Sequence, residues 1–600
     1  AGVAAPMASA LPCDPAASFQ YVIVTNAAMK ASTIQPNLLS LVAHKQSRGL
    51  TATIVTVEEI YAAYPGRDNP EKIRNFVKDA YAKWETDFVL LAGDVNIIPI
   101  RSVRNSHAYT DAYYGCLDGS WDGNGNNTFA EDTDGERSGR KQLPLDLVMD
   151  VYVGRASAEN ATEMSNFVFK TLAFENLPAD DPARFGSLLI GKDGGGLPSL
   201  EYGSDTGGYA TKGFNTNPLM KTDRLYDHEA PWTAPELIAK MNSNRYTLMN
   251  GIGHGSATGC FYIMRQNYAQ IVNTKPFFLY ANSCDCGNFQ YDCVQEWLTT
   301  STRGGAFAAV MHVYLTGLSD DYARQFWDAH LSRMVENLGA LHAEAIRGLY
   351  LENGYTEHIF DTALLGDPET RILTWAPTAR PVVRSASASD AAANADGLVN
   401  PGETATVSAI LANAGKTAAT GVTATLSCAD PYVSVTDAAA AYPDLPPAGI
   451  DRSPLDTFAI SVSPSCPTPR TVAMNLSIRG NGGTAWTDSF PLTVWTSSVI
   501  AGKVTLDGAA KSGATVTCEG PSGKKTFTTA KSGAYSFAVG NGTHRLQALL
   551  GDKVSTSDVR TIAAPPGNAA LNFEYKTVTI QGTVTNAATI QSVNRIEDLS

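Results

Sequence analysis

Two short apolar stretches in the middle of the chain each lead to a side chain that could do chemistry. Residues 246–249 precede His254, which lies among three glycines, and residues 277–280 precede Cys284. Neighbouring parallel strands would bring both side chains to one carboxyl edge, where open α/β sheets place their sites. A histidine beside a cysteine can take its proton and leave a thiolate nucleophile. The alternative is a buried structural cysteine and a histidine in a loop.

The residues around this pair predict the sheet that must position it. Apolar runs at 21–24, 51–55 and 88–92 alternate with helical spacing at 35–46 and 70–84. This β-α-β-α-β order predicts a parallel sheet with helices on both faces. A second α/β unit follows a linker at 178–182. Further strands are expected at 147–153, 187–190, 305–311 and 363–365, with an edge at 372–373, and helices at 161–176, 235–241, 321–337 and 339–351.

Composition excludes some classes of protein. The chain has 600 residues, 44% of them hydrophobic, and a formal charge of −14 without a long basic run, which disfavours nucleic-acid binding. The sequence contains no run of eighteen apolar residues, so it predicts no helix that spans a membrane. The Ala-rich start fits a processed amino terminus. Little Lys and Arg, with much Thr, Ser, Gly and Asn in the second half, suits a secreted protein. The nine cysteines are an odd number, so one stays free if the rest pair, and Cys428 with Cys466 is the disulfide we expect.

An acidic, Gly-rich segment interrupts the α/β pattern between residues 110 and 143. Asp122-Gly-Asn-Gly-Asn126 places oxygen ligands at alternate positions, as calcium loops do, although Asn127 and Thr133 depart from the EF-hand pattern. A long loop with few apolar anchors needs another source of order, so we expect structural Ca²⁺; the alternative is a solvated acidic loop. The expected ligands are Asp118, Asp122, Asn124, Asn126 and Glu131.

After residue 377 the helical patterns give way to short alternating strands and frequent turns, which predict all-β sandwich modules. The fold class we expect is therefore multidomain, with an α/β region of two subdomains followed by β modules. The expected boundaries are a lead-in at 1–20, an N-terminal α/β subdomain at 21–180, a catalytic subdomain at 181–376, a β-sandwich at 377–497, a second β module at 498–576 and the start of a further module at 577–600.

The first 375 residues resemble the gingipain-type cysteine peptidases, caspase-like enzymes secreted by bacteria. The similarity is spread over residues 73–78, 88–94, 98–99, 151–155 and 366–368, and is most specific at Gly253-His-Gly-Ser256 and Cys284-Asp-Cys-Gly-Asn-Phe289. The resemblance implies a caspase-like fold with His254 as general base and Cys284 as nucleophile, while Cys286 falls at a non-catalytic position. It also implies an oxyanion hole formed by the backbone N–H groups of Gly255 and Cys284.

The same resemblance suggests further site residues. Asp193 matches the carboxylate that orients the histidine, although an Asp before Gly is also common in turns. Asp205 matches the acidic residue at the base of the pocket in Arg-specific members, where it would pair with a substrate cation. Ile252 and Asn282 depart from the family pattern beside that pocket, and Asp320 or Asp321 could serve in place of Asp205. The acidic loop resembles calcium-binding loops of the family.

The β modules resemble an immunoglobulin-like sandwich at 377–496 and a carboxypeptidase-regulatory-like module at 498–576, both adhesive or spacer modules. The leading hypothesis is a secreted or cell-surface bacterial cysteine endopeptidase that cuts protein or peptide substrates after Arg or Lys, without an organic cofactor. Two alternatives stay open: a cell-surface structural or adhesive protein that uses an inactive peptidase fold as a platform, and a processing transpeptidase. The β modules are expected to serve in cell-surface association or self-association.

Overall fold

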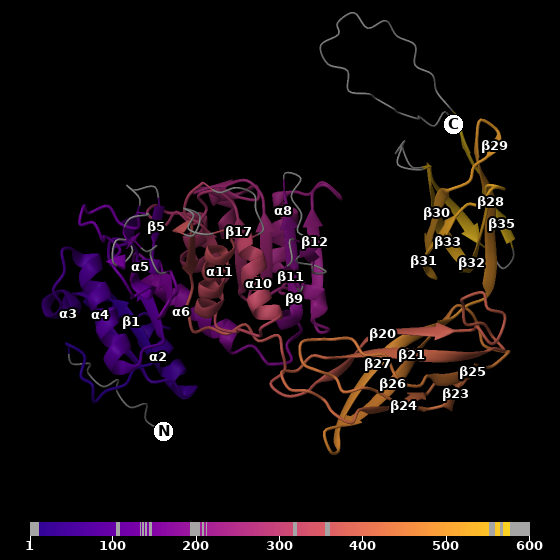
Figure 1. The fold of residues 1–600 in the computed structure, drawn as a ribbon, viewed down its shortest axis with the longest axis horizontal. Helices are drawn as coiled ribbons and strands as arrows, with labels where there is room; N and C mark the ends of the chain where they lie inside the picture. The colour runs from indigo at the N-terminus through magenta and orange to yellow at the C-terminus, as the bar shows by residue number, and fades with distance from the viewer. Residues whose placement is uncertain are drawn as a thin grey trace, which may run out of the picture. The chain divides into compact units, whose positions relative to one another are not determined.

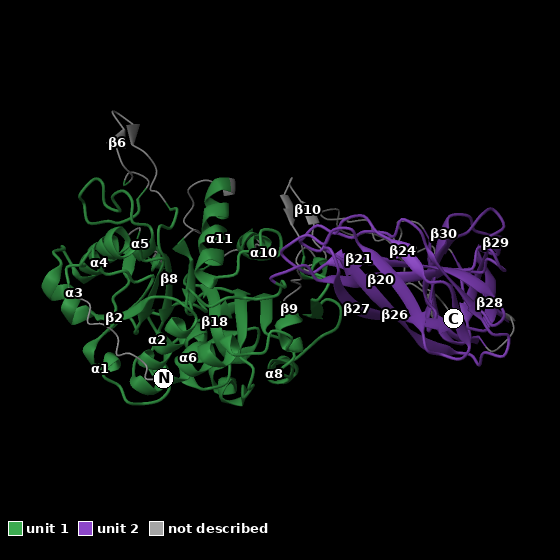
Figure 2. Cartoon of the chain, turned by 90° about the horizontal axis from the view of Figure 1, so that it is seen from below, with its two compact units in different colours: residues 1–376 green, residues 377–600 purple. Residues whose placement is uncertain are grey.

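The computed structural model describes residues 11–103, 108–131, 134, 137–138, 141–142, 147–192, 204–206, 209–211, 213–315, 321–353, 360–550, 558–564 and 568–576. The chain divides into two compact units, residues 1–376 and 377–600 (Figure 2). The first unit is α/β and the second is all-β, so the predicted fold class is confirmed. The finer domain boundaries stay predictions.

A ten-stranded sheet forms the centre of the first unit, in the order β12-β9-β13-β17-β18-β19-β8-β3-β1-β2 (Figure 1). Its paired neighbours run parallel except at β18 and β19, which are antiparallel. In chain order the strands are β1 (Tyr21–Thr25), β2 (Ala52–Thr56), β3 (Phe88–Ala92), β8 (Tyr152–Ala156), β9 (Gly186–Gly191), β12 (Lys221–Tyr226), β13 (Leu248–Ile252), β17 (Phe277–Asn282), β18 (Ala306–His312) and β19 (Thr362–Leu365).

Helices cover both faces of this sheet, as continuous apolar strands require. Val22 and Val24 belong to one core and Tyr21 and Ile23 to another, so alternate residues of β1 are buried on opposite sides. In Figure 2, α10 and α11 lie on one side of the sheet and α2, α6 and α8 on the other. The helices are α1 (Ala27–Lys30), α2 (Leu38–Ser47), α3 (Val57–Ala63), α4 (Asn69–Trp84), α5 (Ala112–Gly115), α6 (Ala161–Glu175), α8 (Ala234–Asn242), α9 (Val294–Glu296), α10 (Asp321–Leu331) and α11 (Leu338–Asn353), with the short helices η1 (Pro182–Phe185), η2 (Phe214–Thr216), η3 (Arg265–Gln270) and η4 (Trp297–Ser301).

A buried charge cluster lies where the two halves of the sheet meet. Only one residue pair, Leu365 with Arg155, registers β19 against β8. Next to this junction, the Lys45 ammonium lies 2.7 Å from Glu175, 2.8 Å from Asp367 and 2.7 Å from Glu369. Lys45 belongs to α2 and Glu175 to α6, whereas Asp367 and Glu369 follow β19. The cluster therefore ties helices of the first half to the segment that ends the second.

Several sequence predictions in this chain are wrong in detail. The strand expected at 147–153 begins only at Tyr152. The helix expected at 321–337 ends at Leu331, and Met334 takes a left-handed backbone conformation, with φ +57°, that interrupts a right-handed helix. The edge expected at 372–373 is an isolated bridge between Asn337 and Arg371. All nine cysteines are free thiols. The Cys428–Cys466 disulfide does not form because the β22–β26 pairing sets Cys428 opposite Met474, further along the chain than Cys466.

Short strands outside the ten-stranded sheet form small sheets in the first unit. The additional strands of the first unit are β4 (Arg101–Val103), β5 (Ala108–Thr110), β6 (Arg137–Ser138), β7 (Lys141–Gln142), β10 (Ser204–Thr206), β11 (Tyr209–Thr211), β14 (Gly255–Ser256), β15 (Gly259–Cys260) and β16 (Ile263–Met264). Among the described residues, no helix is long and apolar enough to cross a membrane.

The second unit begins with two four-stranded sheets, β20-β21-β25-β23 and β24-β22-β26-β27, which share one hydrophobic core. A separate core lies between the sheets built on β28 and β30. Alternate burial along β26 is what a sandwich strand with one core face requires. The strands are β20 (Pro381–Ser389), β21 (Thr404–Asn413), β22 (Thr423–Cys428), β23 (Val433–Asp437), β24 (Ala439–Ala441), β25 (Phe458–Val462), β26 (Arg470–Gly480), β27 (Thr484–Val494), β28 (Ser497–Leu506), β29 (Ala509–Ala510), β30 (Ala514–Gly520), β31 (Gly523–Thr528), β32 (Ala534–Gly540), β33 (Gly542–Leu550), β34 (Asp558–Ala564), β35 (Asn568–Ala570) and β36 (Phe573–Tyr575).

Candidate active site

The register of two parallel strands brings the predicted histidine and cysteine together. β13 pairs with β17 up to Ile252 opposite Asn282, so His254 and Cys284 each lie two residues beyond the last pair. Hydrogen bonds continue across the two chain segments: the backbone N–H of Gly253 donates to the Asn282 carbonyl at 3.2 Å. The Ser283 hydroxyl donates to the Gly253 carbonyl at 2.7 Å. His254 is exposed and Cys284 is partly exposed, so both reach the surface at the same edge.

Gly255 allows the two segments to approach closely. A Cβ atom at this position would overlap the Cys286 sulfur and lie 2.8 Å from Ser283 Cβ and 3.2 Å from the Cys284 carbonyl oxygen. Real Cβ atoms do not approach neighbours this closely, so a side chain here would push the histidine segment away from the cysteine segment. The glycine after His254 is therefore required by packing against the residues around Cys284.

A hairpin with a strained turn follows His254 and packs against the glycines that precede it. β14, β15 and β16 form a small antiparallel sheet directly after His254. At its turn Phe261 and Tyr262 both have positive φ, +52° and +62°. Two positive φ values define a type I′ turn, which normally uses Gly or Asn. The buried Phe261 ring fills the space beside Gly251 and Gly253, and a Cβ on Gly253 would lie 3.3 Å from it. Packing of this ring explains why the strained turn persists.

The cysteine segment is fixed by backbone contacts and by one buried amide. Asp285, between the two cysteines, has φ +60° and donates its N–H to the Tyr314 carbonyl at 3.1 Å. The N–H of Gln295 donates to the Cys286 carbonyl at 3.1 Å. The Gln295 side-chain amide donates to the carbonyls of Ala309 at 2.6 Å and Ala363 at 2.9 Å. Gln295 thus connects the loop that carries Cys284 and Cys286 to β18 and β19.

The two neighbouring cysteines differ in exposure. The left-handed turn at Asp285 separates a partly exposed Cys284 from a fully buried Cys286. Burial raises the pKa of the Cys286 thiol well above its usual value. A buried thiol with a raised pKa has little thiolate and no access to substrate. The geometry therefore favours Cys284 as the reactive cysteine.

The remaining predicted site residues are placed only in part. Asp193 and Asp320 lie outside the described residues. Lys192, just before Asp193, donates its backbone N–H to the Ile252 carbonyl at 3.0 Å, so that segment reaches the end of β13 beside His254. Asp205 lies in β10, opposite Ala210 of β11.

The other residues predicted to contact substrate, Asp321, Ile252 and Asn282, lie in the described part of the chain. Asp321 begins α10 and forms an ion pair with Arg324 at 2.8 Å. Ile252 and Asn282 are 6% and 2% exposed, so they form the buried ends of their strands. Their side chains lie within the sheet end that carries the site.

The acidic loop is folded around its own oxygen atoms. The Asp122 side chain is fully buried and forms an ion pair with Arg67 at 2.5 Å, while its second oxygen, Oδ1, has no hydrogen-bond partner. The amides of Asn124 and Asn126 both reach Glu131 Oε2, at 3.1 and 2.7 Å. Asp118 is exposed. Among the described residues no group of three or more His, Cys, Asp or Glu side chains could hold a metal ion. Asp122 Oδ1 is thus a buried carboxylate oxygen without a hydrogen-bond partner in the described loop.

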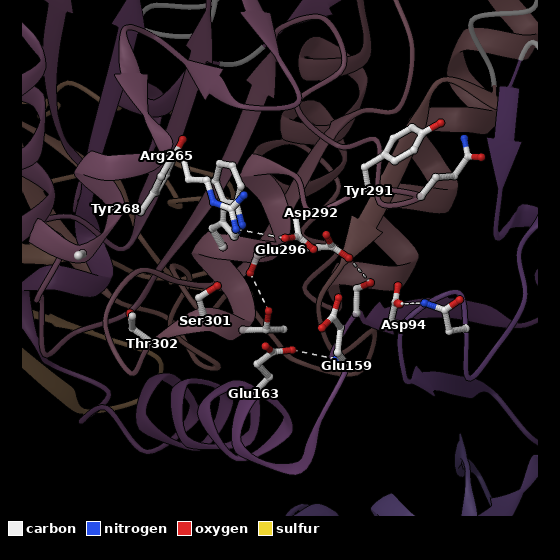
Figure 3. Close-up of a pocket in the computed structure, with 16 residues that line it drawn as sticks. Asp94, Glu159, Glu163, Arg265, Tyr268, Tyr291, Asp292, Glu296, Ser301 and Thr302 are labelled. Atoms are coloured by element: carbon white, nitrogen blue, oxygen red, sulfur yellow. Dashed lines mark hydrogen bonds and ion pairs between the residues drawn. The ribbon is translucent and has the colours of Figure 1, made fainter.

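A separate acidic pocket of about 360 Å³ opens at the carboxyl ends of β3 and β8 (Figure 3). Neither His254 nor Cys284 lines it. Arg265 and Asp292 form an ion pair at 3.2 Å, and the buried Glu296 carboxyl is hydrogen-bonded to Ser157 at 2.5 Å. Burial raises the pKa of Glu296 to about 8. The lining residues include Asp94, Glu159, Glu163, Tyr268, Tyr291, Asp292, Glu296 and Trp297.

Sequence reasoning missed three residues that hold these sites together. Ser283 and Gln295 are buried polar residues outside any motif. The Ser283 hydroxyl donates to the histidine segment, and the Gln295 amide donates to carbonyls of β18 and β19. Asp134 is fully buried and accepts N–H groups from Gly123 at 3.1 Å and Glu131 at 2.8 Å, closing the acidic loop. Only its place among the loop's acidic residues could have singled out Asp134.

Comparisons with known proteins identify the family of this chain. The family model described as peptidase family C25 matches residues 14–373. Lys-gingipain HG66 of Porphyromonas gingivalis is 23% identical over 229 residues, which are 37% of this chain and 12% of that protein. The chain thus aligns with about an eighth of the length of this relative.

Two solved structures are similar over much of the chain. The complex of Porphyromonas gingivalis RgpB pro- and mature domains has 18% identity and a TM-score of 0.46, covering 79% of this chain and 100% of that one. The Arg-specific cysteine proteinase gingipain R has 18% identity and a TM-score of 0.44, covering 79% and 97%. Because the family model covers more than half of the sequence, the predicted resemblance is confirmed, and the chain belongs to peptidase family C25, the gingipain-type cysteine peptidases.

Proposed function

We propose that this protein is an endopeptidase in which Cys284 is the nucleophile and His254 the general base. The observation that carries the proposal is the shared register of β13 and β17, which brings both side chains to one edge two residues beyond the last pair. The exposure of Cys284 and the burial of Cys286 support the choice between the cysteines. Family membership supports protein or peptide substrates.

In this mechanism His254 takes the Cys284 proton, and the thiolate attacks the scissile carbonyl carbon to form a tetrahedral intermediate. Backbone N–H groups of Gly255 and Cys284 would stabilise its oxyanion. His254 then returns the proton to the leaving amine, and a thioester remains on Cys284. Water, deprotonated by His254, attacks the thioester and releases the acid product and the thiol. Asp193 would orient the histidine ring.

The test is a matched pair of variants. Cys284→Ala should abolish peptide hydrolysis, because the attacking sulfur is gone, while Cys286→Ala should retain a measurable part of it. Labelling with peptide acyloxymethyl ketones, located by mass spectrometry, should modify Cys284 alone. An active Cys284→Ala variant together with an inactive Cys286→Ala variant would reverse the assignment.

We further propose cleavage after Arg or Lys, with Asp205 as the favoured determinant and Asp320 or Asp321 as alternatives. The names of the similar proteins, Lys-gingipain and Arg-specific gingipain R, support a basic residue at that position. A desolvated carboxylate favours a substrate cation, and removing one partner of such a pair costs about 2–5 kcal/mol. A peptide library cut by the wild type and by Asp205→Asn tests this, since an unchanged preference in the variant would exclude Asp205.

The acidic loop is proposed to hold structural Ca²⁺. The oxygen ligands would come from Asp118, Asp122, Asn124, Asn126 and Glu131. The fully buried Asp122 carboxylate with its unpartnered oxygen supports the assignment. The ion would order the loop and takes no part in the reaction. We also propose that the protein is secreted, which its composition supports. The immunoglobulin-like module and the β module after it would serve as adhesive or spacer modules, which their two separate hydrophobic cores support.

A further inference from the structure

A second pair of sulfur atoms lies directly beneath the histidine and cysteine segments. Cys260 and Cys286 are 3% and 0% exposed, and the Cys286 thiol is within hydrogen-bonding reach of the Cys260 thiol. Cys286 Sγ lies 3.6 Å from the carbonyl oxygen of Gly259, the residue before Cys260. Cys260 Sγ lies 3.5 Å from the hydroxyl of Ser283, the residue before Cys284. Each cysteine therefore contacts the segment that carries the other.

The strand pairing explains how the two thiols meet. Gly255 and Cys260 are partners in the antiparallel β14–β15 pair. Side chains of paired residues point to the same face of such a ladder. On that face the space of the absent Gly255 side chain is filled by Cys286 Sγ. The Cys286 sulfur thus lies beside its cross-strand neighbour Cys260, on the face that connects the hairpin to the nucleophile loop.

We propose that Cys260 and Cys286 are a redox pair that forms a disulfide in oxidising surroundings and cross-links the hairpin after His254 to the loop after Cys284. The bond would restrain the two catalytic segments relative to each other. Cys284 is not one of the two cysteines in this bond.

The oxidant is a low-molecular-weight disulfide. One cysteine loses its proton to solvent, and its thiolate attacks a sulfur of the external disulfide, releasing one small thiolate and leaving a mixed disulfide. The second cysteine, after losing its proton, attacks the protein sulfur of the mixed disulfide and releases the second small thiolate. Both released thiolates take up protons, so two protein thiols are oxidised and one external disulfide is reduced to two thiols.

The hairpin provides the route for reaction. Its three strands have two residues each, and Tyr262 and Met264 at its surface are 57% and 41% exposed. Short strands with few ladder hydrogen bonds open more readily than the sheet beneath them. Opening would expose Cys260 first, because Cys260 lies on the hairpin itself, whereas Cys286 lies on the loop that Gln295 holds through the Cys286 carbonyl. Reclosure would bring the mixed disulfide back to Cys286.

The test uses the full chain carrying Cys284→Ala, so that reagents do not react at the nucleophile. After incubation with oxidised glutathione and blocking of remaining thiols, peptide mapping without reductant should find Cys260 linked to Cys286. The thermal midpoint should rise by roughly 5 °C and return to its starting value with reductant. No linked peptide between these residues after incubation, including incubation at a temperature that opens the hairpin, would overturn the proposal.

Matched variants test whether the oxidant-dependent rise in the melting temperature comes from the Cys260–Cys286 bond. Cys260→Ala and Cys286→Ala should each lose the oxidant-dependent rise, and Cys293→Ala, which removes another fully buried thiol of the same segment, should keep it. A rise that persists in Cys260→Ala would contradict the pairing. If one of these variants fails to fold, peptide mapping of the chain carrying Cys284→Ala still tests whether Cys260 is linked to Cys286. The readout needs no turnover, so it can fail or succeed independently of the proposed peptidase activity.

Discussion

Replacing Lys45 by Met should destabilise the first unit strongly, because it leaves buried carboxylates without their shared cation. Lys45 and Asp367 have fully buried side chains 2.8 Å apart, and Glu175 and Glu369 are 4% and 5% exposed. Removing one partner of a buried ion pair costs about 3–5 kcal/mol. Arg48 still reaches Glu175 and Glu369, at 2.6 and 3.0 Å, so the unbalanced charge falls mainly on Asp367.

The sign of the pH dependence makes this prediction specific. Burial already raises the pKa of Asp367 and Glu369 in the intact cluster. Loss of Lys45 raises them further, so the folded variant binds more protons than its unfolded chain above pH 4. The variant therefore loses stability as pH rises, by up to about 1.4 kcal/mol per pH unit for each proton. The loss should be larger at pH 8 than at pH 5.

The assay is chemical unfolding of the wild type, Lys45→Met and the control Arg48→Met at both pH values. Arg48 belongs to the same cluster but is 29% exposed, so its removal should cost about 1 kcal/mol or less. Equal losses in the two variants, or a Lys45→Met loss that does not grow with pH, would refute the reasoning.

Three further predictions follow from other parts of the first unit. Burial lowers the pKa of His342 to about 4, so stability should fall as pH drops from about 6.5 towards 4, and His342→Gln should flatten that part of the profile in unfolding measurements. Gly255→Ala should lower turnover roughly 100-fold by separating the catalytic segments, and Cys286→Ala in the same chain should restore part of it; unchanged turnover would show that the close approach is unnecessary. Chelation of Ca²⁺ should lower the melting temperature of the wild type, and Asp122→Ala should be insensitive to chelator; equal melting with and without chelator in the wild type would exclude the ion.

Much of the α/β unit follows from local patterns. β3 has the predicted bounds, and β1, β9 and β17 lie within a residue or two of theirs, because each is a short apolar run between turn residues. The apolar run at 246–249 predicts the strand before His254 about two residues too early, since β13 spans Leu248–Ile252. The strand continues through Gly251, where a side chain would overlap the Phe261 ring. No local pattern reveals that packing.

The site could be predicted only as far as sequence spacing reaches. Glycines and apolar runs locate His254 and Cys284 in the sequence. The contact of Cys260 with Cys286 depends in addition on the β14–β15 hairpin and on the β13–β17 register, which brings segments that are distant in the sequence together. The expected disulfide between Cys428 and Cys466 shows the same limit, since both cysteines lie in one β-rich region and strand register keeps them from pairing. Ser283 was likewise missed, because a buried hydroxyl shows its partner only in the folded chain.

The alignment of β13 with β17 also bears on how this site withstands sequence change. The positions of His254 and Cys284 are set by a count of residues from paired backbone atoms, and most other side chains of the two strands are buried in the core. Point substitutions in these strands can accumulate without moving the reacting atoms, whereas deletion of a single residue within either strand would turn its terminal side chain to the opposite face. The site should therefore tolerate wide drift in composition and almost none in strand length.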